Sequence, residues 1–294
     1  MSNYIISCCS TADLTKEHFI KREISYICFH YELDGRHYRD DLGESMPFDE
    51  FYRAMANGAD TKTSQVNAGE FEEYFEPFLQ QGKDILHVCL SSGISGVLNS
   101  ANIAADILRE RYPERRIYVV DSLGASLGYG LLMDRLADLR DNGMSIDELY
   151  EWTNANKLKV QSWFFTSDLT FFIKGGRVSK TAGVIGGILN ICPLLNIDRQ
   201  GKLIPRFKIR TKKKVMEKIV DQMEQYALDG NDYSGNCYLV QSACLEDAEA
   251  VRKLVKERFP KVGEVRINSI GTTIGSHTGP GTVGLFFWGD ERED

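Results

Sequence analysis

A strand, a helix and a second strand follow one another between residues 84 and 120, and this unit constrains the fold more than any other part of the chain. The segments 84–90 and 117–120 are apolar enough for buried strands. The segment 96–111 between them carries small and apolar side chains at helical spacing, namely Val97, Ala101, Ala104, Ala105 and Leu108. Two strands joined by a crossover helix pair in parallel, with a right-handed connection. The unit therefore predicts an α/β fold with a mainly parallel sheet.

The rest of the chain divides into two α/β halves. We expect strands at 4–8, 24–29, 237–240, 265–267 and 283–288, and helices at 48–55, 71–80 (interrupted by Pro77), 131–139, 146–154, 211–228 and 248–255. Hairpin turns are predicted at Asp34-Gly35 and at 198–201. From about residue 160 the chain becomes richer in aromatic residues and in glycine. We therefore expect a three-layer α/β/α domain over 1–160 and a two-layer α/β domain over 161–294. A ligand cleft should lie between them, with the loop at 60–70 reaching into it.

Composition argues against several classes of protein. The net charge of -7 does not suit nonspecific nucleic-acid binding, which needs a basic surface. No run of 18 apolar residues occurs, so we expect no membrane span. The 7 cysteines contain no CxxC pair and are typical of reduced thiols, so we expect a cytoplasmic protein without a metal or redox cofactor.

Hydroxyl groups and glycines gather in four predicted loops near strand ends. Such loops offer hydroxyls and backbone N–H groups to an anion without a full opposing charge, which is typical of a site for an acidic headgroup. The four loops are Cys9-Ser10-Thr11, Thr61-Lys62-Thr63-Ser64-Gln65, Ser91-Ser92-Gly93-Ile94-Ser95-Gly96 and His277-Thr278-Gly279-Pro280-Gly281.

Five motifs in a fixed order give the chain a resemblance to a known family. It resembles the DegV family of fatty-acid-binding proteins, which includes the lipid-presenting subunit of bacterial fatty acid kinase, over essentially its whole length. The matching motifs are STADL at 10–14, TSQ at 63–65, SSxxSG at 91–96, GGR[IV] at 175–178 and HxGPG at 277–281. Each is weak alone, but five in order are specific.

The resemblance implies what the loops should hold. In the family, a long-chain fatty acid lies between two domains, and hydroxyls of the TSQ and SSxxSG loops hold its carboxylate. Carried over, the headgroup contacts are Thr63, Ser64, Ser92 and Ser95, with His277 and Thr278 nearby. The resemblance also implies an ATP-dependent partner kinase that makes an acyl phosphate. Three positions depart from the family: Cys8-Cys9 replaces Thr-Asp, Val66 replaces proline, and Val97-Leu98 replaces Thr-Tyr.

Other residues are candidates for the tail and for a partner. The aromatic and apolar segment from 164 to 195 could line a tunnel, although plain core packing explains such residues equally well; the candidates are Phe164, Phe165, Phe171, Ile185, Ile188 and Leu189. Arg177 follows two glycines and could contact ligand or phosphate, or simply be exposed. Arg206, Lys208 and Arg210 alternate along a predicted strand and should face one side, as a solvated row or as a docking site for an acidic kinase.

Three alternatives remain open from the residues alone. Ser95 could be only a helix N-cap, and Thr63 only a turn hydroxyl. Ser95, Asp121 and His277 occur in the order of an α/β-hydrolase triad, but the final glycine of the nucleophile elbow is missing. Strand-end hydroxyls would also suit a small anionic substrate such as a phosphosugar.

Overall fold

A four-stranded parallel sheet forms the centre of the first half, as the crossover unit predicts. The computed structural model describes residues 3–179 and 191–294. The strands lie in the order β2-β1-β6-β7, and every pair is parallel. Their bounds are β1 (Tyr4–Cys9), β2 (Ile24–Ile27), β6 (Asp84–Cys89) and β7 (Ile117–Asp121).

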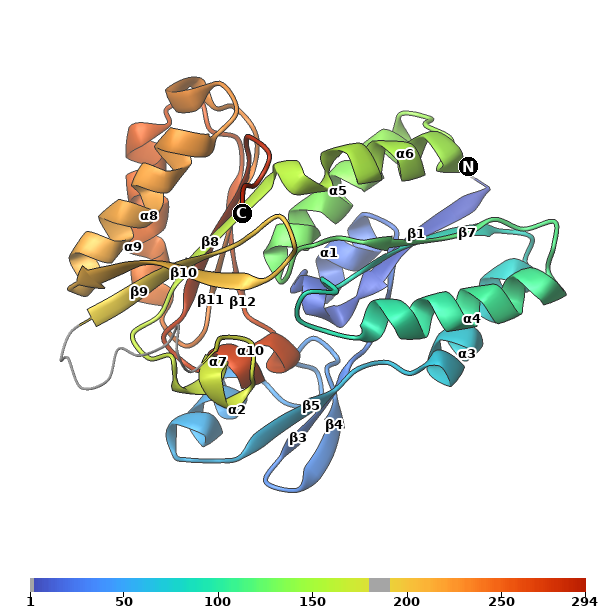
Figure 1. The fold of residues 1–294 in the computed structure, drawn as a ribbon, viewed down its shortest axis with the longest axis horizontal. Coiled ribbons are helices and arrows are strands. Elements are labelled where there is room, and N and C mark those ends of the chain that lie inside the picture. The colour runs from blue at the N-terminus through green and yellow to red at the C-terminus, as the bar shows by residue number, and fades with distance from the viewer. Residues whose placement is uncertain (1–2, 180–190) are drawn as a thin grey trace.

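Helices cover both faces of this sheet, which confirms the three-layer arrangement. Figure 1 shows α3 and α4 on one face and α5 and α6 on the other. The helices of this half are α1 (Lys16–Lys21), α2 (Phe48–Ala56), α3 (Ala68–Gln80), α4 (Val97–Arg111), α5 (Leu127–Asp141) and α6 (Ile146–Asn156). The predicted interruption of α3 at Pro77 is wrong. The helix continues because Phe71, Phe75 and Leu79 bury one face of it before and after the proline.

A six-stranded sheet forms the second half. Its strands lie in the order β10-β9-β8-β13-β11-β12, and only β11 and β12 pair in parallel. The strands are β8 (Val160–Phe165), β9 (Ile191–Ile197), β10 (Leu203–Arg210), β11 (Cys237–Gln241), β12 (Val265–Ser269) and β13 (Val283–Trp288). Helices α8 (Lys212–Tyr226) and α9 (Leu245–Arg258) cover its outer face (Figure 1), and Thr211 caps α8 as predicted.

The inner face of this second sheet shares a core with the first half. Strand alternation divides its side chains between two cores. Phe164, Val240 and Phe286 belong to the core that continues into the first half, whereas Trp163 and Phe165 pack beneath α8 and α9. The inner face is therefore the surface on which a ligand between the halves would lie.

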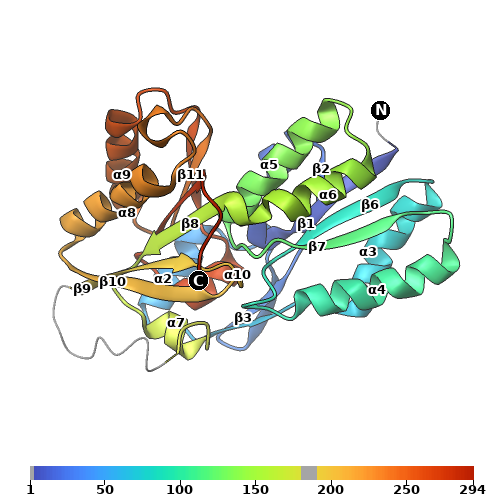
Figure 2. The same cartoon turned by 45° about the horizontal axis from the view of Figure 1, so that its top comes forward.

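A small antiparallel sheet and two short helices close one side of this interface. Strands β3 (His30–Leu33), β4 (Arg36–Arg39) and β5 (Thr61–Ser64) lie in the order β4-β3-β5, and the Asp34-Gly35 hairpin turn is confirmed. The segment predicted as a loop at 60–70 thus contains a strand. Helix α10 (Thr272–Thr278) lies against β3 and β5 and beside α7 (Thr170–Lys174), as Figures 1 and 2 show.

Over 3–179 and 191–294, no helix has the length and apolarity needed to cross a membrane. Within the same ranges, no cluster of three or more His, Cys, Asp or Glu side chains could hold a metal ion. All seven cysteines are free thiols.

Candidate functional site

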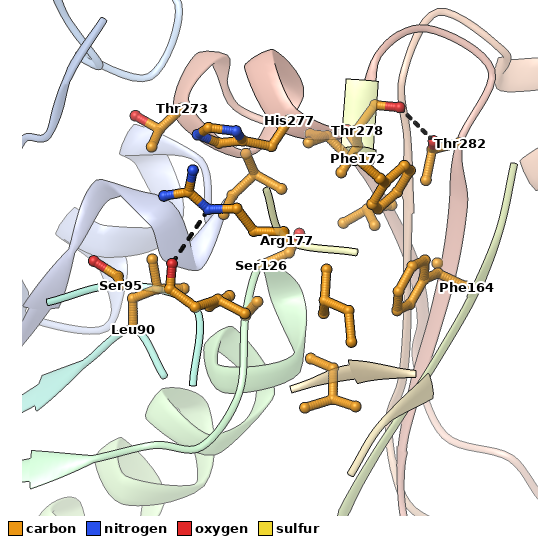
Figure 3. A pocket seen from close by; sticks show the side chains of 18 of the residues that line it. Leu90, Ser95, Ser126, Phe164, Phe172, Arg177, Thr273, His277, Thr278 and Thr282 are labelled. Atoms are coloured by element: carbon orange, nitrogen blue, oxygen red, sulfur yellow. Dashed lines mark hydrogen bonds between the residues drawn. The ribbon is translucent and has the colours of Figure 1, made fainter. Parts of the chain in front are cut away.

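A pocket of about 750 Å³, counting the part open to solvent, lies between the two halves (Figure 3). Most of its lining is apolar, and the polar side chains come from α10, the small sheet, the loops after β6, β7 and α7, and the turn before β13. The lining residues are Phe29, Thr63, Leu90, Ile94, Ser95, Ala125, Ser126, Phe164, Phe172, Arg177, Ile197, Leu203, Val240, Ile270, Thr273, Ile274, His277, Thr278, Thr282, Gly284 and Phe286. A cavity of this composition suits an elongated apolar ligand with one polar end.

Helix α10 presents one face to the pocket. Its lining residues follow helical spacing, at Ile270 just before the helix and then Thr273, Ile274, His277 and Thr278. The prediction that His277 lies in a turn is wrong, because the turn begins only at Gly279. That glycine has φ +70°, and a Cβ there would lie 2.2 Å from the Phe171 ring. The glycine therefore lets the chain turn sharply against Phe171.

Thr63 and His277 meet at the polar part of the pocket. Thr63 Oγ1 lies 2.7 Å from His277 Nε2. Gln65 holds this segment against the neighbouring loop, because its amide nitrogen donates to Ser100 Oγ at 3.0 Å. A Cβ at Gly96 would lie 3.0 Å from Gln65 Oε1. The TSQ and SSxxSG segments are thus fixed side by side.

The SSxxSG loop reaches across to the second half. Ser91 Oγ donates to the carbonyl oxygen of Gly201 at 2.8 Å, in the turn between β9 and β10. A Cβ at Gly93 would lie 2.5 Å from the same oxygen, so the close approach requires glycine. Ser95 Oγ accepts from the backbone N–H of Val97 at 3.3 Å, at the start of α4. Ser95 therefore supports the helix start and still lines the pocket.

Among the described residues that line the pocket, Arg177 is the one with a fully ionised side chain. Its Nη1 donates to the carbonyl of Gly175 at 2.5 Å and its Nε to that of Ile94 at 3.3 Å (Figure 3 draws the second bond). Burial lowers the pKa of the guanidinium from its ordinary value, but an arginine stays protonated near neutral pH. The pocket thus holds one positive charge.

His277 is neutral at physiological pH. Burial, and then the charge of Arg177, lower its pKa to about 4. Its Nδ1 is buried with no hydrogen-bond partner in the described part of the chain, as is Oγ1 of Thr278. A Cβ at Gly175 would lie 2.3 Å from that Nδ1, so the missing side chain at Gly175 makes room for the imidazole.

Two buried carboxyl groups tie the first half to the start of α10. Asp13 accepts hydrogen bonds from the Ser126 hydroxyl and from the Gly271 N–H, the latter at 3.0 Å. Asp40 accepts from Ser10 at 3.0 Å and from Thr272 at 2.8 Å. Burial raises the pKa of both carboxyls. The STADL motif therefore supports the site from behind rather than lining it.

Several predicted contacts do not lie in the lining. Ser64 is exposed, because alternation along β5 turns it away from Thr63, and Ser92 is exposed with its N–H donating to Asp121 at 3.1 Å. Phe165 packs in the second core, so its predicted tunnel role is wrong. Phe171 lies behind the pocket against Gly279. Ile185, Ile188 and Leu189 lie outside the described residues.

The predicted basic row is also wrong. The pairing register of β10 shifts between Pro205 and Phe207, so the alternation breaks there. Arg206 Nε donates to Asn196 at 2.8 Å, whereas Lys208 and Arg210 are exposed beyond the shift. The three cations do not form one face.

The alternative enzymatic functions find little support in this geometry. Asp121 Oδ1 accepts from the backbone N–H groups of Ser92 and Leu123, and His277 Nε2 bonds Thr63. No carboxylate therefore orients His277 in the described residues, as a hydrolase triad requires. A phosphosugar would need polar partners along its length, where this lining is mostly apolar.

Sequence reasoning missed much of the inner wall. Leu90, Val240, Gly284 and Phe286 line the pocket without belonging to any motif quoted for the headgroup. Alternation could have paired Gly284 with Phe286 on one face of β13. It could not have said which face meets the ligand, because five of the six residues of that strand are buried.

Fold and pocket together define an α/β protein with two main sheets and an apolar cavity between its halves. A family model described as "Uncharacterised protein, DegV family" matches residues 6–290. A DegV domain-containing protein of Clostridium perfringens is 36% identical over 293 residues, covering 100% of both chains. The chain belongs to the DegV family.

Solved structures resemble the chain over its whole length. A DegV lipid binding protein from Thermotoga maritima is 27% identical, with a TM-score of 0.86 and 100% of both chains covered. A DegV family protein from Thermus thermophilus, described for its fatty acid binding, is 26% identical to this chain. Its TM-score is 0.87, and the match covers 98% of this chain and 99% of that one. These relatives share the fold of this chain, and they are described as binding lipid and fatty acid, respectively.

Proposed function

We propose that this chain binds a long-chain fatty acid in the pocket between its two larger sheets and presents the carboxylate to a partner kinase. The observation that carries the proposal is the make-up of the pocket. Thr63, Ser95, Arg177 and His277 contribute polar groups to one part of it, while the wall from the second sheet is apolar. The T. maritima and T. thermophilus relatives, named for lipid and fatty acid binding, support the same ligand class.

Tail and head would contribute differently to binding. Burying about 14 methylenes at about 0.8 kcal/mol each is worth on the order of 11 kcal/mol before the loss of ligand freedom is subtracted. An ionised carboxylate cannot enter such a cavity without donors. Arg177 balances its charge, and the hydroxyls of Thr63 and Ser95 donate to it. The tail would therefore set the affinity and the head the orientation.

In the proposed cycle this chain binds and the partner supplies ATP. A carboxylate oxygen attacks the γ-phosphorus of ATP on the kinase, the bond to the bridging oxygen breaks, and ADP leaves. The product is an acyl phosphate still seated by its tail. We propose that the chain itself is not the catalyst, since its sequence contains neither GxxxxGK[ST] nor a kinase signature.

Extraction of purified protein into organic solvent, followed by mass spectrometry, tests the ligand class. The expected result is a long-chain acid at near-stoichiometric amount. A phosphosugar, or an empty pocket that also fails to take up added oleic acid, would overturn the proposal.

Paired substitutions test the head contacts. The double variant Thr63→Ala, Ser95→Ala should lower acid occupancy and kinase-dependent phosphorylation, with an unchanged circular dichroism spectrum. The matched control is Ser64→Ala, Ser92→Ala, because these neighbours are exposed. Equal behaviour of the two double variants would contradict the assignment.

A further inference from the structure

A glycine stands in the wall that the second sheet gives to the pocket. Gly284 lies on β13, which is flanked by β8 and β11 inside the six-stranded sheet, and it lines the cavity. Glycine within a strand weakens it, because no side chain packs on the neighbouring strands. Such a glycine marks a site where another group comes close to the backbone.

The side chains of neighbouring residues close over Gly284. The strand register places Phe164 and Val240 directly opposite it on the two adjacent strands, and Phe286 follows two positions later on the same face. All three line the pocket. A Cβ at Gly284 would lie 2.9 Å from Val240 Cγ2 and 3.0 Å from Phe286 Cζ. A larger residue here would push these side chains into the cavity.

Gly284 and these neighbours belong to the apolar side of the pocket. In Figure 3, Ser95 and Leu90 lie on one side of the cavity and Phe164 on the other, with Arg177 and Ser126 between them. A ligand whose carboxylate meets Ser95 and Arg177 therefore directs its far end toward β8 and β13.

We propose that the methyl end of the bound acid lies against Val240 and Phe286, and that Gly284, by letting these two side chains lie close to the sheet, sets the longest acyl chain the protein accepts. The inference rests on the proposed function and specifies its substrate by chain length. Phe164, Val240 and Phe286 form the end wall of the cavity, and the missing side chain at Gly284 keeps this wall from moving farther into it.

Two opposite substitutions test this end wall. Gly284→Ala takes room from the terminal methylene, so affinity for the longest acids should fall about fourfold for each methylene displaced, relative to shorter acids. Val240→Ala opens the same space and should shift preference toward longer acids. The measurement is native mass spectrometry of protein incubated with an equimolar series of saturated acids from lauric to arachidic.

A neighbouring residue supplies the control. Leu285 lies on the same strand but faces the second core, so Leu285→Val should lower stability and leave the length preference unchanged. Val240→Ala carries the test if Gly284→Ala does not fold. Unchanged length preference in folded Val240→Ala and Gly284→Ala, or a shift equal to that of Leu285→Val, would overturn the inference while acid binding itself stands. A wild-type protein that binds none of the acids would overturn the proposed function as well.

Discussion

Thr63 Oγ1 lies 2.7 Å from Nε2 of His277, although 214 positions separate the two residues in the chain. The contact joins a strand of the small sheet to α10. Because the pKa of His277 is lowered to about 4, its imidazole is neutral near pH 7 and can share a single proton with the threonine hydroxyl. The polar part of the pocket is therefore assembled from segments that only the folded chain brings together.

Thr63→Val tests the role of the threonine hydroxyl. Valine keeps the shape and removes the donor, so affinity for a long-chain acid should fall roughly 10- to 100-fold, the worth of one hydrogen bond to a charged group. Affinity for the methyl ester of the same acid should change little, because the tail contacts remain. Displacement of a fluorescent fatty acid measures both, and an equal loss for acid and ester would contradict the prediction.

Arg177→Met should raise the pKa of His277. The arginine charge is the second cause of the low value, after burial, so its removal should move the pKa upward from about 4 while burial keeps it below the ordinary 6.5. Titration of the imidazole resonances by NMR measures the shift. Lys174→Met is the control, because Lys174 is exposed and pairs with Asp60. The prediction fails if the two variants titrate alike.

His87 should make folding stability depend on pH. Burial between Phe71 and Phe75 lowers its pKa to about 3, against an ordinary value of 6.5. Between these values the unfolded chain binds more protons. The free energy of unfolding should therefore fall as pH drops below about 6.5, by at most about 1.4 kcal/mol per pH unit for this residue.

Urea unfolding of wild type and His87→Gln at several pH values measures this contribution. The comparison uses only the slope of the unfolding free energy against pH, because the variant also changes packing and removes the hydrogen bond between His87 Nδ1 and Ser7. The variant should show the shallower decline on acidification. Parallel curves would exclude His87 as the source.

The crossover unit and the ordered motifs were readable from the sequence because each rests on local spacing. Other features were not. The segment around Thr63 is polar and looks like a loop, and it becomes strand β5 only by pairing with β3. Helix α10 has seven residues and follows a glycine, so its hydroxyls and His277 look like a turn. Tertiary contacts, rather than propensity, decide both elements.

The choice between Phe164 and Phe165 shows a second limit. Every residue of β8 is buried, since cores lie on both faces of the sheet. No polar alternation therefore marks the pocket side. The register shift in β10, which separates Arg206 from Lys208, likewise leaves no trace in the pattern of charges.

Gly201→Ala should loosen the contact between the two halves. Gly201 has φ +74°, and a Cβ there would lie 1.9 Å from Ser91 Oγ. Gly143 is a matched control, with φ +88° and nothing within 4 Å of an added Cβ. Both alanine variants meet the same backbone strain, of order 1–3 kcal/mol, but only Gly201→Ala also displaces Ser91. Thermal unfolding and acid binding should both suffer more in Gly201→Ala, and equal losses would contradict this.

The single positive charge of the pocket has a consequence for turnover in the proposed cycle. One guanidinium beside a neutral imidazole matches a monoanion, whereas an acyl phosphate carries more than one negative charge near neutral pH. The surplus charge is poorly tolerated in a cavity walled by hydrocarbon. In the proposed cycle, the protein would therefore bind the acyl phosphate less tightly than the fatty acid, which would favour release of the product.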